Sequence, residues 1–128
     1  MDRRRAFSGS PWEAKVAYCR AIRAGQHVYV SGTAPVAIGG GVHAPGDAYA
    51  QARRCWEIVD KALGELGAKL SDVVRTRMFV TDIARWQEFG RAHHDVFSAS
   101  PPATTMIEVK ALIDPALLIE VEVDAYLG

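Results

Sequence analysis

The sequence predicts an α+β domain in which two helices pack on one face of a mixed β-sheet. Two observations predict this fold class. Segments with alternating apolar residues and segments with helical apolar spacing follow each other in the order β, β, α, β, α, β, β. The chain has 128 residues, 49% of them hydrophobic, which is enough for one core in a single domain.

The N-terminal part is predicted to form a loose arm and then two strands. Residues 1–15 mix Arg, Ser, Gly and Pro, so the single domain is expected to span residues 16–128. Short β-branched stretches at 16–23 and 27–32 predict strands joined by a turn. No apolar segment follows the basic start and none approaches a membrane span, so we expect a cytoplasmic protein without a membrane partner.

Two helices are predicted after this hairpin. The first begins after a suitable N-cap, Asp47, and ends before Gly67. Its apolar residues recur at helical spacing, at Ala48, Ala52, Cys55, Val59, Ala62 and Leu66. The second covers about 84–98 behind Thr81-Asp82, and its expected apolar stripe is Trp86, Phe89, His93 and Val96 or Phe97.

Three further strands complete the predicted sheet, at Val73–Val80, Ala103–Val109 and Leu118–Tyr126. Alternation places Val74, Thr76, Met78, Val80, Ile119, Val121, Val123 and Ala125 on the core side. The other side receives Arg75, Arg77, Phe79, Met106, Glu120, Glu122 and Asp124. Such a face is either solvated, with ion pairs between strands, or it binds a ligand or another subunit.

The candidate chemistry rests on carboxylates. Cys19, Cys55 and the adjacent His93 and His94 fit no metal-ligand spacing, so we expect neither a metal nor a disulfide. Ser31 has no nucleophile-elbow signature. Glu120 begins a strongly apolar strand, where partial burial would raise its pKa and suit a general acid–base. The 15 basic and 15 acidic residues balance, which disfavours a nucleic-acid partner.

Several blocks of the sequence, in this order and spacing, resemble the RidA/YjgF family, also labelled endoribonuclease L-PSP-like. They are Tyr18, Val30-Ser31-Gly32, Ala34-Pro35-Val36, Gln51-Ala52, Val74 to Asp82, Pro102 to Val109 and Ile119 to Glu122. The resemblance implies a chorismate-mutase-like fold and a homotrimer with a small-molecule cleft between subunits. It also implies a hydrolase of reactive enamines and imines that needs no cofactor.

The resemblance carries roles to individual positions. Glu120 matches the family's water-handling glutamate when one residue is inserted near positions 113–115. Tyr18, Ser31 and Gly32 match substrate-binding positions of the cleft. Three further cleft positions differ from the deaminase pattern. Thr104 stands where the deaminases have an arginine, Met106 where they have a cysteine, and Gly90 where asparagine is common.

The missing arginine leaves the function open at this point. A guanidinium fork to a partly buried carboxylate contributes roughly 2–5 kcal/mol, so activity on simple 2-imino acids is in doubt. Either Arg75, Arg77 or Arg91 replaces it, or the ligand differs. The sequence therefore leaves three functions: an enamine or imine hydrolase, a non-catalytic metabolite-binding trimer, and an endoribonuclease or translation inhibitor. The balanced charge makes the third the least favoured.

Overall fold

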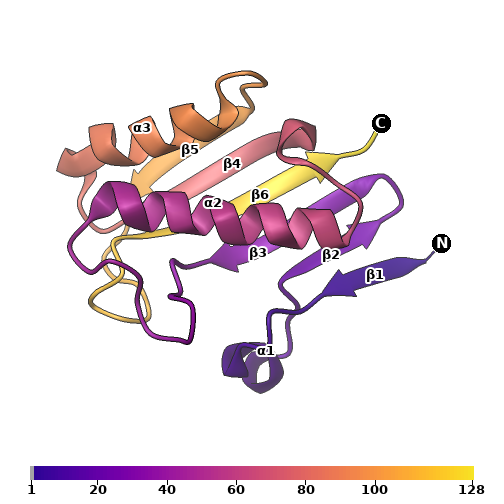
Figure 1. Ribbon diagram of the computed structural model, residues 1–128, viewed down its shortest axis with the longest axis horizontal. Coiled ribbons are helices and arrows are strands. Elements are labelled where there is room, and N and C mark those ends of the chain that lie inside the picture. The colour runs from indigo at the N-terminus through magenta and orange to yellow at the C-terminus, as the bar shows by residue number, and fades with distance from the viewer. Residues whose placement is uncertain (1) are drawn as a thin grey trace.

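The computed structural model describes residues 2–128 and contains one six-stranded sheet of order β1-β2-β3-β6-β4-β5 (Figure 1). The strands are β1 (Arg3–Ala6), β2 (Ala21–Ala24), β3 (His27–Thr33), β4 (Val73–Val80), β5 (Ala103–Glu108) and β6 (Ile119–Tyr126). Neighbouring strands are antiparallel except β4 and β5, which are parallel. The sheet is therefore mixed, as predicted.

Two long helices cover one face of this sheet, and a short third helix lies near the start of the chain, between β1 and β2 (Figure 1). The helices are α1 (Pro11–Val16), α2 (Ala48–Glu65) and α3 (Trp86–Phe97), with 3-10 turns at η1 (Leu70–Asp72) and η2 (Ile83–Arg85). Between residues 2 and 128, no helix is both long and apolar enough to cross a membrane. The α+β prediction with two helices on one face is confirmed, and α1 is an addition to it.

The predicted loose arm is wrong for its described part. Strand β1 pairs antiparallel with β2, from Arg3 opposite Ala24 to Ala6 opposite Ala21. The strand predicted at 16–23 is confirmed only in its second half, as β2, because α1 ends at Val16 and a loop precedes Ala21. Ser10 caps this helix by accepting from the Trp12 N–H, with a proline at the first turn. These are ordinary helix-start signals.

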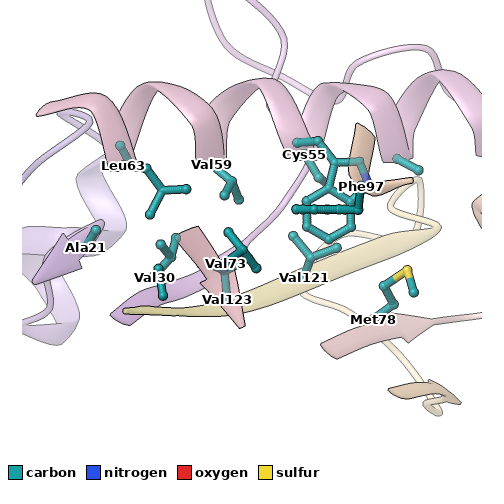
Figure 2. Close-up of a cluster of buried hydrophobic side chains, with 14 of the residues drawn as sticks. Ala21, Val30, Cys55, Val59, Leu63, Val73, Met78, Phe97, Val121 and Val123 are labelled. Atoms are coloured by element: carbon teal, nitrogen blue, oxygen red, sulfur yellow. The ribbon is translucent and has the colours of Figure 1, made fainter. Parts of the chain in front are cut away.

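The core lies between α2 and the sheet. The cap prediction for α2 is confirmed, since the Asp47 carboxylate accepts from the Ala50 N–H at 2.9 Å and Gly67 has φ +81°. Figure 2 shows the buried face of α2 above the sheet, with Cys55, Val59 and Leu63 directed toward side chains of the strands. Burial of this stripe is the main force that fixes α2 on the sheet.

Three predicted side-chain positions need correction. A β-bulge between Val73 and Arg75 shifts the register against β6, so Val73 is buried and Val74 is 51% exposed. Trp86 is 55% exposed at the start of α3 and does not belong to its apolar stripe. Met106 is opposite the buried Met78 and therefore lies on the helix-covered face.

The other face of the sheet has no helix over it and carries mixed chemistry. Arg77 forms ion pairs with Glu122 at 3.7 Å and Asp124 at 3.3 Å, which confirms the predicted pairing for this arginine. Exposed aromatic residues lie beside these charges: Tyr126 is 46% exposed, and its ring lies edge-on to His27 at 5.0 Å. This open face offers polar and apolar surface together, as an interface between subunits would.

Candidate functional site

Glu120 lies against the backbone of β3. The pairing of β3 with β6 is irregular between Val30 and Thr33, and this irregularity contains Gly32. A Cβ atom built on Gly32 would lie 2.2 Å from Oε2 of Glu120. Only glycine therefore allows the carboxyl group to occupy this position.

Arg20 binds the same stretch of β3 as Glu120 and was not predicted as a site residue. Its Nη1 donates to the Gly32 carbonyl at 2.9 Å and to the Thr33 hydroxyl at 3.2 Å. Its guanidinium also lies over the Tyr18 ring at 5.6 Å and has its Nε 3.7 Å from Glu13. The only sequence signal that could have indicated Arg20 is its position two residues after Tyr18 and just before an apolar strand. Its burial depends on its contact with Glu13 of α1, a helix that was not predicted.

The pKa of Glu120 is raised above its usual value. Burial is the largest cause, because it disfavours the charged form of the carboxyl group. The nearby Arg20 opposes the rise and Glu122 adds to it. A carboxyl group with a raised pKa is suited to accept a proton from water and to return it later. The environment proposed for Glu120 from the sequence is therefore present in the structure.

A hollow of about 370 Å³ opens beside Tyr18 and Ser31. Its lining comes from β1, α1, the segment after α1 and the end of β3. The lining residues are Arg5, Phe7, Glu13, Ala14, Ala17, Tyr18, Cys19 and Ser31. The Ser31 hydroxyl donates to the Cys19 carbonyl at 2.7 Å, so its free lone pairs remain available as acceptors. We call Tyr18, Arg20, Ser31, Gly32 and Glu120 the Glu120 cluster.

The remaining predicted residues lie at the β5 edge of the sheet, away from the central strands that carry Glu120 and Gly32. Thr104 and Met106 are on the edge strand β5, and Gly90 is in α3 above it. We call these three residues the Thr104 edge. Strands β6 and β4 separate β5 from β3. Thr104 and Met106 also point to the helix-covered face, whereas Glu120 points to the open face.

Thr104 is part of a chain of uncharged polar groups. The buried Thr76 hydroxyl is 2.6 Å from the Thr104 hydroxyl and 2.8 Å from Nε2 of His93. The imidazole of His93 packs against Trp56 and Phe97. Burial lowers the pKa of His93, so the ring is neutral near pH 7. Where the deaminases have an arginine, this chain therefore has the uncharged Thr104 hydroxyl, which is hydrogen-bonded to Thr76 and through it to the neutral His93.

None of the three arginines considered as replacements lines the hollow. Arg77 is paired with Glu122 and Asp124 on the open face. Arg91 lies over the Tyr49 ring at 4.3 Å, on the helix-covered side. Arg75 is exposed on β4, opposite Asp124. The arginine that does line the hollow is Arg5 of β1, in the segment predicted to be a loose arm.

No group of three or more His, Cys, Asp or Glu side chains is arranged to hold a metal ion within residues 2–128. Cys55 is buried, and burial raises the pKa of its thiol. Cys19 is partly exposed and borders the hollow.

The chain is similar to a known protein family in sequence and to solved structures in fold. The family model described as endoribonuclease L-PSP matches residues 9–127. A crystal structure from Mycobacterium tuberculosis, of a member of the YjgF/YER057c/UK114 family, is 46% identical with a TM-score of 0.88. The match covers 98% of this chain and 99% of that chain.

Two curated relatives extend the comparison. An uncharacterized protein of Streptomyces coelicolor is 37% identical over 98% of this chain and 92% of its own length. A protein of Acinetobacter baylyi named 3-aminoacrylate deaminase RutC is 33% identical over 81% of this chain and 82% of its own length. The first carries no activity in its name, whereas the second names an enamine substrate.

Proposed function

The chain belongs to the RidA/YjgF family, whose model is described as endoribonuclease L-PSP, and we propose that it hydrolyses a small enamine or imine to a carbonyl compound and ammonia. The observation that carries the proposal is the half-buried Glu120 carboxyl group, with its raised pKa, over Gly32. The relative named 3-aminoacrylate deaminase adds support from similarity. Glu120 is the proposed catalytic residue.

The proposed reaction uses one water molecule, with Glu120 as the proton carrier. An enamine first gains a proton on carbon and loses one from nitrogen to give an imine. Glu120 then takes a proton from water as the oxygen attacks the imine carbon, and returns it to the nitrogen to give a carbinolamine. Glu120 next takes the remaining hydroxyl proton and delivers it to the nitrogen, so the C–N bond breaks and ammonia leaves as the carbonyl forms. Tyr18 and Ser31 would hold the substrate beside this carboxyl group, since both line the adjacent hollow.

We further propose that the cleft lies between subunits of a homotrimer. The Glu120 cluster lies at the central strands β3 and β6 with its carboxyl group on the open face, whereas the Thr104 edge lies on the edge strand β5 and the helix-covered face. One chain therefore does not bring them together, but a neighbouring copy could place its Thr104 edge against the cluster. Gly90, Thr104 and Met106 would then shape the substrate side from the second subunit. The mixed open face supports such an assembly.

The proposal is tested by ammonia release from two unstable substrates, 3-aminoacrylate and 2-iminobutyrate, each generated in the assay by a coupled enzyme. The wild type should exceed the spontaneous rate, and Glu120→Gln should lose about 100-fold in rate. Glu122→Gln is the matched control, because Glu122 lies two residues along the same strand and face. It pairs with Arg77 rather than with the β3 backbone, so this variant should keep most of the activity.

The Glu120→Gln variant should remain folded. A raised native pKa means that the native state binds this proton more tightly than the unfolded chain. Stability is therefore lost as pH rises above the usual carboxyl pKa, and Gln removes that loss. At pH 7 the variant should unfold at the same or a higher temperature than the wild type. A wild type that does not exceed the spontaneous rate with either substrate would contradict the hydrolase proposal.

A second candidate function, a non-catalytic metabolite-binding protein, is favoured by one observation. The Thr104 hydroxyl is held by Thr76 and offers no charge where the deaminases have arginine. In this case a small molecule would raise the unfolding temperature without being consumed. The ribonuclease activity in the family description gains no support from the charge, since basic and acidic residues both number 15.

A further inference from the structure

The hollow beside Tyr18 has an unbalanced positive charge. Its lining contains two charged side chains, Arg5 and Glu13. The Glu13 carboxylate is already neutralised: it accepts from the Ser8 N–H at 3.1 Å and from the Ser8 hydroxyl, and Arg20 lies 3.7 Å away. Glu13 is also buried. Its charge is therefore used to hold α1 in place and does not compensate Arg5.

Arg5 itself has no partner among residues 2–128. No ion pair or side-chain hydrogen bond involves its guanidinium in this part of the chain, whereas the adjacent Arg4 donates to the Glu65 carbonyl at 3.2 Å. Alternation along β1 explains the difference. Arg4 lies on the face covered by α2, and Arg5 lies on the open face, opposite Ile22. Five guanidinium N–H groups are thus available at the edge of the hollow.

The rest of the lining suits a small ligand with an apolar part. Phe7, Ala14 and Ala17 supply apolar surface, while Tyr18 and Ser31 supply hydroxyl groups. A volume of about 370 Å³ falls within the range of small-molecule sites. One guanidinium fork beside apolar carbon fits a planar carboxylate, which it can bind through two parallel N–H···O bonds.

We propose that Arg5 binds the carboxylate of a small ligand whose carbon body lies in this hollow, and so determines the specificity of the site. Arg5 would then supply from β1 the cation that Thr104 does not supply from β5. This inference rests on the proposed function for its location, because the hollow adjoins the Glu120 cluster. It adds the residue of this chain that would hold the carboxylate of such a substrate.

The test compares two probes that differ in one group, 2-oxobutyrate and its neutral amide, 2-oxobutyramide. Their binding is measured by calorimetry on the full-length protein. The wild type should prefer the carboxylate by about tenfold, which is about 1.4 kcal/mol. Arg5→Gln should abolish this preference and leave amide binding unchanged. Arg5→Lys should keep part of it, since the charge remains but the fork is lost.

Arg3→Gln is the matched control. Arg3 is two residues before Arg5, on the same strand and the same face, but does not line the hollow. It should keep the full carboxylate preference. A wild type without carboxylate preference, or an equal loss in the Arg3 and Arg5 variants, would overturn the assignment. Carboxylate preference that depends on Arg5, found without turnover by the wild type, would contradict the hydrolase proposal but support the role of Arg5.

Discussion

Around Tyr18 and Glu120, the polar groups are charged and close to one another, whereas at the β5 edge they are uncharged. The first region contains Glu13, Arg20 and Glu120: Arg20 lies beside Glu13 and donates to the Gly32 carbonyl of β3, and Glu120 lies against Gly32. The second contains the hydroxyls of Thr76 and Thr104 and a histidine that burial keeps neutral. The charged groups are thus concentrated in the first region, whereas the second offers shape and hydrogen bonds.

This difference indicates which of the two regions would have to recognise the charge of a substrate. A neutral edge cannot attract an anion strongly, so a carboxylate-bearing substrate would have to be recognised from the charged region. Arg5 is the cation placed to do so. The comparison can be tested by disturbing each region separately and by asking whether the two act in one cleft.

The largest difference is expected between two glycine-to-alanine variants. Gly32→Ala would place a methyl group 2.2 Å from Oε2 of Glu120, so the carboxyl group must move. Displacing the proposed general base should lower the rate of ammonia release by about 100-fold. The variant should also be destabilised by about 1–3 kcal/mol, as in other overpacked sites.

Gly90→Ala is the counterpart at the other edge. A Cβ on Gly90 would meet nothing closer than Trp86 at 3.9 Å, and Gly90 lies inside α3. The substitution should stabilise the protein by about 0.5–1 kcal/mol, because alanine favours helix over glycine. Urea unfolding and the ammonia assay measure both variants. Equal activity losses in the two would contradict the separation of roles.

A mixing experiment tests whether the two regions share one cleft between chains. Glu120→Gln removes the proposed base, and Thr104→Trp would block the other side. If each cleft takes Glu120 from one subunit and Thr104 from its neighbour, an equal mixture refolded together should regain about one quarter of wild-type activity. Both variants alone should be inactive. No recovery in a mixture shown to form hybrid trimers would place both groups in clefts of a single chain.

Arg20 is expected to control the ionisation of Glu120. Its positive charge opposes the rise in the pKa of Glu120, so Arg20→Gln should raise that pKa further. The acidic limb of the pH–rate profile should therefore move to higher pH. Arg23→Gln is the control, because Arg23 donates to the Leu66 carbonyl at 2.9 Å, at the end of α2, and has no contact with the cluster. An unshifted profile in Arg20→Gln would mean that Glu120 does not set this limb.

The sequence allowed most of the fold to be predicted, but among the charged residues around the site it indicated Glu120 and not the arginines. Periodicity located α2, α3 and the strands β3, β4, β5 and β6, most of which bury a regular apolar stripe. It failed before residue 20, where β1 is short and carries Arg3, Arg4 and Arg5. Glu120 was a candidate from its place on an apolar strand, and the resemblance to the RidA/YjgF family assigned it the catalytic role. Arg20 and Arg5 were missed, because their importance depends on the packing of α1 and β1, which no local pattern reveals.

The smallest effect is expected from the histidine of the neutral edge. Burial lowers the pKa of His93 below its usual 6.5, so the unfolded chain binds a proton more readily than the native state. Stability is therefore complete above pH 6.5 and decreases as pH falls below it. His93→Gln, whose amide can still bond to Thr76, should lose less stability between about pH 7.5 and pH 5.5 in urea unfolding. His94→Gln, at the exposed neighbouring position, should follow the wild type. Identical curves for all three proteins would show that the pKa of His93 does not differ between the native and the unfolded state, which would contradict the neutral state assigned to His93 by burial.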